Sequence, residues 1–253
     1  MVFLTILFFL LLPHLLGPVL IRLSNKQEAY PEFNGLRYEE LPSTVAAAFA
    51  RSRDMLRGLG FEQIACLYKA GSAENVRTYL ILLVNRATNE AAIVFDMMTA
   101  GGVAPIHRLV TEFSTDLSNG VEVSTSDGGD PIPYRKNPEK HLYKFPEVKN
   151  PWALYNLHRQ MVSRHAAPGV YAYLPTPGNE IQALSASINK TLMKQVEFGY
   201  LYLDKRGEFF RPTWKGAILM TWKLAWPAGM IQRALIKRRA RHMMKQLRHA
   251  WAY

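Results

Sequence analysis

Acidic residues are missing from the C-terminal part of this sequence. After Glu208 the chain has no Asp or Glu, whereas it has nine Lys and Arg residues from Trp214 onward. The formal net charge is +11, so that only +2 remains for residues 1–213. A positive charge confined to one end of a chain favours a local anionic partner over a uniformly basic surface.

The sequence also has only one cysteine and none of three common catalytic or cofactor-binding motifs. The single cysteine, Cys66, excludes an internal disulfide and suits a reducing compartment. The chain has no G-x-S-x-G, no H-E-x-x-H and no G-x-G-x-x-G. No motif therefore specifies a reaction, and we expect no cofactor. An enzyme whose catalytic residues come together from distant parts of the chain stays open.

The N-terminus holds the longest apolar run. The first fixed charge is Arg22, and the 21 residues before it would form a helix of about 30 Å, the thickness of a hydrocarbon core. A cleaved signal peptide is the rival interpretation, but no basic segment precedes the run and no small-x-small site follows it. We therefore predict an uncleaved signal-anchor over residues 1–23. The Lys and Arg residues that follow it predict a single-pass protein whose globular domain is cytoplasmic.

The residues after the apolar run predict a polar linker at 24–42 and an α+β domain at 43–213. A helix is expected at 43–59, where Gly58 and Gly60 end it. Strand patterns then predict an antiparallel sheet of about five strands, with Asn119-Gly120 as its strongest hairpin signal. The predicted strands are 61–70, 77–86, 91–99 and the two that flank the hairpin, and the later elements are helices at 150–165 and 178–198 and a hairpin at 199–213.

Three sets of polar residues are candidates for chemistry. Asp127 and Asp130 in "SDGGDP" are weak candidates for a metal, because calcium needs more oxygen ligands at fixed offsets, and a turn explains the stretch as well. Two histidines seven residues apart lack a third ligand, which a zinc site requires. Two carboxylates four apart on a strand share a face and could do acid–base work, although a solvated edge is the simpler interpretation. The histidines are His158 and His165, and the carboxylates are Glu112 and Asp116. We therefore predict no metal site and no catalytic residue.

Residues 214–253 form an apolar and then basic tail. Residues 216–231 are apolar but too short, and too interrupted by Lys223, to span a bilayer with the roughly 20 residues it needs. From Ile236 onward, a step of about 100° per residue gathers Met243, Met244 and Leu247 on one side of a helix and the cations on the other. The tail is therefore a basic amphipathic helix.

Three partners compete for this helix. Its apolar side could pack on the domain, its cations could bind nucleic acid, or the whole tail could lie on anionic lipid. The lipid interpretation is favoured by Trp with flanking cations, and nucleic acid is not expected because the tail lacks an aromatic stacking platform. A calmodulin-like protein would bind the same helix. The predicted membrane-contacting residues are Trp222, Trp226, Arg233, Lys237, Arg238, Arg239, Arg241, Lys245, Arg248 and Trp251.

These patterns predict a membrane-anchored, non-enzymatic binding or scaffolding protein that also meets an unknown protein partner. One alternative is a membrane-bound enzyme acting on a lipid or envelope precursor. The other is a membrane-tethered DNA binder, because a helix at 178–198 followed by a hairpin has the outline of a winged helix. That alternative needs a helix-turn-helix before the hairpin.

Overall fold

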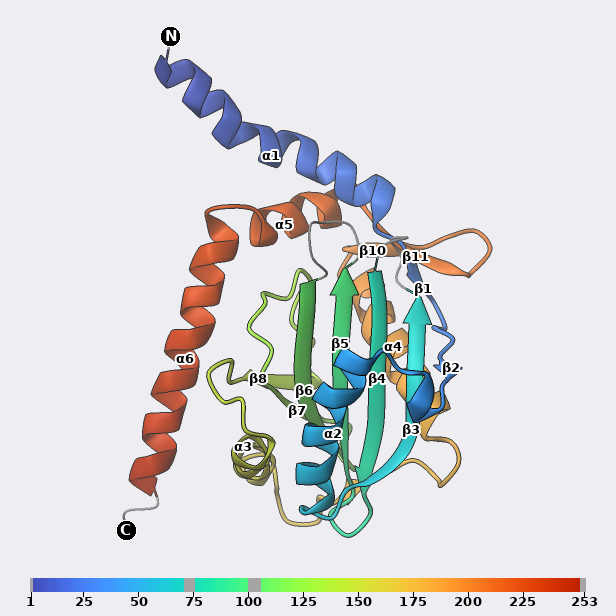
Figure 1. The fold of residues 1–253 in the computed structure, drawn as a ribbon. Coiled ribbons are helices and arrows are strands. Elements are labelled where there is room, and N and C mark those ends of the chain that lie inside the picture. The colour runs from blue at the N-terminus through green and yellow to red at the C-terminus, as the bar shows by residue number, and fades with distance from the viewer. Residues whose placement is uncertain (1, 71–75, 100–105, 251–253) are drawn as a thin grey trace. The chain divides into compact units, whose positions relative to one another are not determined.

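The computed structural model describes residues 2–70, 76–99 and 106–250, and the side chains of residues 12–69, 77–98 and 108–247 within them (Figure 1). The chain forms two compact units, each assembled from segments distant in sequence. Residues 43–213, expected as one domain, contribute to both. Unit 1 comprises 1–31, 130–137 and 184–236, and unit 2 comprises 32–129, 138–183 and 237–253.

Unit 2 is built on a mixed sheet of eight strands. Its order is β2-β3-β4-β5-β6-β7-β8, with β9 paired to β6. The neighbours from β2 to β7 are antiparallel, as short polar connections favour, whereas β7 and β8 are parallel. The strands are β2 (Asn34–Gly35), β3 (Glu62–Ala70), β4 (Val76–Asn85), β5 (Glu90–Thr99), β6 (Ile106–Leu117), β7 (Glu122–Ser126), β8 (Lys140–Lys144) and β9 (Ala172–Tyr173).

Helices cover one face of this sheet. The strands place apolar side chains on that face at every second residue, and the helices turn an apolar side of helical period toward it. Helix α2 (Ser43–Arg57), which follows the 3-10 turn η1 (Tyr38–Glu40), buries Phe49 and its neighbours at helical spacing. Helix α3 (Pro151–Ser163) begins at Asn150, whose side chain accepts the Trp152 N–H at 2.9 Å. Phe113 of β6 is fully buried in the core that these helices form with the sheet.

The hairpin predicted at Asn119-Gly120 joins β6 to β7. Gly120 has φ +84°, which L-residues with a side chain rarely adopt, and its N–H donates to Leu117 O at 2.9 Å. The pairing of Asp116 with Glu122 closes the strands on either side of the turn.

Unit 1 contains helices around a three-stranded antiparallel sheet of order β1-β11-β10. Its core has few buried side chains, among them Leu192, Phe210 and Met220. Helix α5 approaches the backbone of Tyr200 so closely that it needs a glycine there, because a Cβ at Gly216 would overlap the carbonyl of Tyr200. The elements are α1 (Val2–Ser24), β1 (Gln27–Glu28), β10 (Leu201–Leu203), β11 (Phe209–Pro212) and α5 (Trp214–Leu224), together with parts of α4 (Glu180–Glu197) and α6 (Ala228–Ala250) that continue into unit 2.

The predicted transmembrane signal-anchor is wrong. Within the part of the chain that the structure describes, no helix combines the length and the apolarity needed to cross a bilayer. The described side chains of α1 begin at Leu12, so they cover about 20 Å of helix, and this part contains Pro13, His14, Pro18 and Arg22. It also packs on protein: a Cβ at Gly17 would lie 2.6 Å from Thr221 Cγ2 of α5.

The predictions of a single-pass topology and of a cytoplasmic domain are wrong for the same reason. Both were derived from the positive-inside rule, which applies only to a segment that spans the bilayer. The α+β class holds without the transmembrane helix. The predicted linker 24–42 contributes to both sheets, since Gln27 pairs with Phe210 and Asn34 pairs with Tyr68.

Candidate functional site

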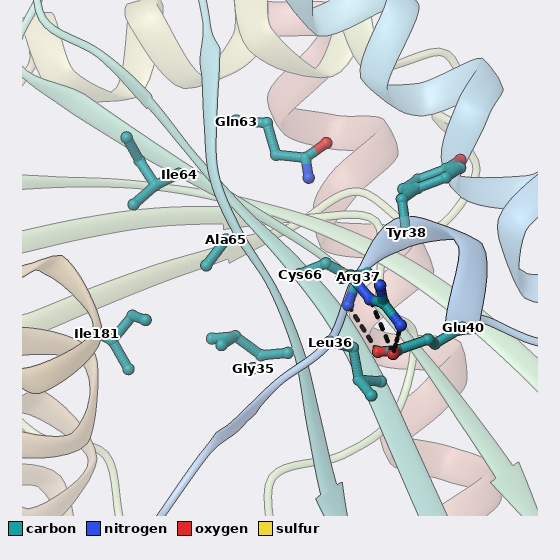
Figure 2. Close-up of a pocket in the computed structure, with 11 residues that line it drawn as sticks. Gly35, Leu36, Arg37, Tyr38, Glu40, Gln63, Ile64, Ala65, Cys66 and Ile181 are labelled. Atoms are coloured by element: carbon teal, nitrogen blue, oxygen red, sulfur yellow. Dashed lines mark hydrogen bonds and ion pairs between the residues drawn. The ribbon is translucent and has the colours of Figure 1, made fainter.

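A shallow, open pocket of about 620 Å³ lies in unit 2 between the segment 35–40 and β3, with Ile181 at its rim (Figure 2). Its charged side chains are Arg37 and Glu40, which pair with each other at 2.8 Å. Their hydrogen bonds lower the pKa of Glu40 and raise that of Arg37. Cys66 is also part of the lining, but its thiol is buried and burial raises its pKa, which suppresses the thiolate. The pocket therefore offers an ion pair and a polar Gln63 to a ligand.

His158 is enclosed in the core of unit 2. Its ring nitrogens lie 2.9 Å from Thr115 Oγ1 and 3.1 Å from Thr125 Oγ1, and its ring stacks on Phe113. Burial lowers its pKa to about 4, so the imidazole is neutral at physiological pH. His165 contacts other partners, the Tyr143 hydroxyl at 2.9 Å and the His141 ring at 4.3 Å between centroids. The two histidines named from the sequence therefore have separate structural roles.

The carboxylate of Asp127 is fully engaged in unit 2. One oxygen accepts the Thr111 N–H at 2.8 Å, and the other accepts the Lys149 ammonium at 3.0 Å. Asp130 belongs to unit 1 and lies 3.4 Å from Arg233 Nε. Neither contact set leaves the convergent oxygens that calcium needs, and the described residues contain no group of three or more His, Cys, Asp or Glu that could hold a metal.

Glu112 and Asp116 share a face of β6, as the two-residue period requires. A further carboxylate, Glu122 on β7, lies 2.6 Å from Lys140 of β8. Burial raises the pKa of Glu112, and the Glu122 charge adds to that effect while Lys140 opposes it. Burial alone would lower the pKa of Lys140, but Glu112 and Glu122 raise it. The cluster is thus an internally compensated ion network across three strands.

The basic end of α6 belongs to unit 2, and its apolar side is occupied. Ala240 and Leu247 are buried in the core of unit 2, and Met243 and Met244 pack against it. Arg241 pairs with Glu147, with Nε 2.8 Å from Oε2, which lowers the pKa of that carboxyl. Besides Arg241, four cations on this part of the helix are exposed, and they form no ion pair among the described residues: Lys237, Arg238, Arg239 and Lys245. Arg248 and Trp251 lie outside the residues whose side chains are described.

Unit 1 presents a different kind of surface on α5. Trp214, Ile218 and Trp222 recur at intervals of four, and Trp226 follows at the same spacing just after the helix. All four are exposed, with Trp222 at 59% and Trp226 at 58%. We call these four residues the tryptophan stripe. The opposite side of α5 is buried through Gly216, Ala217 and Met220, so the stripe lies on the exposed side of an anchored helix. The ring of Trp222 also lies 5.0 Å from the His14 ring of α1, between centroids.

The neighbouring helices of unit 1 add more exposed apolar side chains. On α1, Leu23 is 74% exposed, and the other exposed residues are Leu15, Leu16, Val19 and Leu20. At the start of α6, Met230, Ile231 and Leu235 are exposed. A hydrogen bond of 2.9 Å between His14 Nε2 and Trp226 O joins α1 to the end of the stripe. Unit 1 therefore exposes apolar side chains on α1, on α5 and at the start of α6.

The cation that interrupts the apolar run turns inward. Lys223 Nζ donates to Tyr134 O at 2.7 Å and lies 5.2 Å from the centre of the Tyr200 ring. Its burial lowers its pKa. The charge of Lys223 is therefore satisfied within unit 1, and it leaves the tryptophan stripe apolar.

Sequence reasoning named Trp222 and Trp226 but missed Trp214, Ile218 and the exposed leucines of α1. The interval of four from Trp214 to Trp226 is the signal that predicts the stripe, whereas the leucines were assigned to a spanning helix. The α3–α4 connection, residues 164–179, is far longer than the turn of a helix-turn-helix, so the described residues lack the motif that the DNA-binding alternative requires.

Comparison of this chain with protein-family models, with curated proteins and with solved structures found no match.

Proposed function

We propose that this chain is a binding or scaffolding protein that attaches to the surface of an anionic lipid bilayer through unit 1, from one side and without crossing it. The observation that carries the proposal is the tryptophan stripe, which lies on the exposed side of a helix whose other side is buried. Tryptophan prefers the level of the lipid headgroups, where its ring meets acyl chains and its N–H meets water.

Charge supports lipid as the occupant of this surface. The chain from Trp214 onward has cations and no carboxylate, so nothing in that segment repels an anionic bilayer. Each Lys or Arg near such a surface gains about 1 kcal/mol. Lys237, Arg238, Arg239 and Lys245 of α6 are exposed and form no ion pair among the described residues, and each of them that meets the bilayer would add to the affinity in this way.

Binding to vesicles by the full chain tests the proposal. The vesicles contain phosphatidylcholine alone or with about 30 mol % phosphatidylserine, at low and high salt. Truncation at Thr213 is unsuitable, because it removes the buried Met220 and Leu247 and so damages both cores. Substitutions of exposed residues leave those cores intact.

The informative variant is W222A/W226A, and W152A is its matched control. Trp152 is 58% exposed, as Trp226 is, but it lies on α3 of unit 2. We expect the double variant to bind anionic vesicles at least about tenfold more weakly, because two interfacial rings are lost, and W152A to bind as the parent does. Equal losses in both variants, or no loss in either, would show that the stripe is not the lipid contact.

A second pair of variants tests the charges. K237A/R238A/R239A should weaken binding about fivefold per cation at low salt, whereas R51A/R57A, on exposed positions of α2, should have little effect. A DNA duplex is included as a competitor. Capture by DNA with no binding to vesicles would assign the cations to nucleic acid and would contradict the proposal.

A further inference from the structure

Arg22 occupies an unusual position beside the tryptophan stripe. It lies in the last turn of α1, where its Nη1 donates to Pro212 O at 2.7 Å. Its guanidinium carbon is 4.8 Å from the centre of the Trp214 ring and 5.7 Å from the centre of the Tyr202 ring. A carbonyl and two rings therefore fix the orientation of the guanidinium group.

The charge of Arg22 is not neutralised by any residue in the described ranges 2–70, 76–99 and 106–250. Among the residues that the structure describes, no carboxylate forms an ion pair with it. A guanidinium group has five N–H donors, and the contact with Pro212 uses one nitrogen of the fork. Oriented donors with an uncompensated positive charge are the features of an anion-binding arginine.

Other cations lie on the same part of unit 1. Arg211 is directly opposite Tyr202 in the β10–β11 pairing, so their side chains share one face of the small sheet. Lys26 Nζ lies 5.0 Å from the centre of the Phe209 ring. The nearby carboxylate of Asp204 is committed to the turn, where it accepts the Glu208 N–H at 2.9 Å, and its pKa is lowered by these turn amides and by Arg211 despite partial burial. Glu28 is opposite Phe209 in the β1–β11 pairing and so shares this face, but the cations Arg22, Lys26 and Arg211 outnumber it.

Trp214 connects this arginine to the lipid surface, because it is both the first residue of the stripe and a platform for the guanidinium group. If the stripe lies at headgroup level, the guanidinium group lies at the level of the lipid phosphates. Arginine binds phosphate through two parallel N–H···O bonds, and a monoester phosphate offers more charge and more free oxygens than a diester does.

We infer that Arg22, held by Pro212 and stacked on Trp214, binds the phosphate of a lipid headgroup and selects a monoester phosphate over a diester. The inference rests on the proposed attachment of unit 1 to lipid. It adds a specific headgroup contact to a surface that would otherwise recognise only charge and apolarity.

The test compares phosphatidylcholine vesicles containing phosphatidic acid, a monoester, with vesicles containing phosphatidylserine, a diester, at matched zeta potential. The full chain should bind the phosphatidic acid vesicles about tenfold more tightly. R22K keeps the charge but removes the planar fork, so it should bind both kinds of vesicle equally. R206K is the matched control, since Arg206 is exposed in the β10–β11 turn, and it should keep the preference.

The outcomes separate this inference from the proposed function. Binding to anionic vesicles with no preference for phosphatidic acid, or a preference that R22K retains, overturns the role of Arg22 and leaves the lipid attachment standing. Binding to neither kind of vesicle overturns both. Near-UV circular dichroism of R22K checks that unit 1 is folded. If R22K is misfolded, R22A is tested as a second substitution at this site.

Soluble glycerol 3-phosphate identifies the source of the phosphate. We expect it to compete only weakly with phosphatidic acid vesicles, because it offers the monoester without the bilayer that the tryptophan stripe requires. Full competition at equal phosphate concentration would assign Arg22 to a free phosphate ligand and would overturn the headgroup inference.

Discussion

The two units of this chain treat their hydrophobic residues differently. Among the residues whose side chains the structure describes, unit 2 encloses a core cluster of 20 buried residues between its sheet and its helices, whereas the core cluster of unit 1 has six. Of the 23 large hydrophobic side chains that are exposed among the described residues, 18 belong to unit 1 and five to unit 2. Unit 2 thus buries most of its large apolar side chains, whereas unit 1 leaves many of them exposed.

The difference in exposed hydrophobic residues makes the surface of unit 1 the first place to search for a binding site. Scattered exposed hydrophobics are normal on any protein, but a regular stripe on an anchored helix is not. In unit 2 the fully buried carboxylate of Glu90 is paired: it accepts hydrogen bonds from Tyr155 at 2.7 Å and from Arg159 at 2.7 Å, whereas Gln160 Oε1 is buried without a hydrogen-bond partner among the described residues. Glu90 therefore supports the fold of unit 2, while the exposed apolar residues of unit 1 are the ones on which the proposed lipid attachment rests.

The largest expected effect concerns the two kinds of aromatic residue. Phe113→Ala removes a fully buried ring that contacts Phe61 and Tyr155, and it should lower the free energy of unfolding by about 3–5 kcal/mol. Trp222→Ala removes a largely exposed ring that contacts the His14 ring, and it should lower the free energy of unfolding by only about 1 kcal/mol. Urea unfolding followed by circular dichroism measures both. A similar loss of unfolding free energy in both variants would show that the two units do not differ in how they use these aromatic residues.

The second effect is a pH dependence in unit 2. Burial lowers the pKa of His158 from 6.5 to about 4, so between these values the unfolded chain binds a proton that the folded chain does not. The stabilisation is complete above pH 6.5 and is lost as the pH falls toward 4, by about 3 kcal/mol. Urea unfolding at a series of pH values should show this slope, and it should be reduced in His158→Gln. An unchanged slope in the variant would mean that other groups dominate.

The smallest effect compares two glycines. A Cβ at Gly216 would overlap the Tyr200 carbonyl in unit 1, so Gly216→Ala should cost about 1–3 kcal/mol and loosen α5. Gly35 in unit 2 has nothing within 4 Å of such a Cβ, and Gly35→Ala should be nearly neutral. Thermal unfolding and vesicle binding of both variants would sharpen the comparison. Full stability of Gly216→Ala would show that unit 1 is loosely packed even at α5.

Much of the local structure could be predicted from the sequence. Helix α2 begins at the predicted residue, the Asn-Gly hairpin joins two strands as expected, and α4 follows its predicted range closely. The short strands β1 and β2 could not be predicted, because two residues carry no periodic pattern and their pairing depends on distant partners. The sequence likewise could not predict that residues 130–137 belong to unit 1. Their place there depends on contacts with distant residues, such as the hydrogen bond from the Arg135 N–H to Gln195 Oε1.

The candidate site divides in the same way. The sequence by itself determined that α6 has an apolar side, that tryptophans recur through α5, and that the acidic residues end at Glu208. Only the tertiary structure decided that the apolar side of α6 is buried through Ala240 and Leu247, whereas the stripe from Trp214 to Trp226 is exposed. The physical reason is that periodicity records which side of a helix is apolar. What covers that side depends on contacts between residues far apart in the chain.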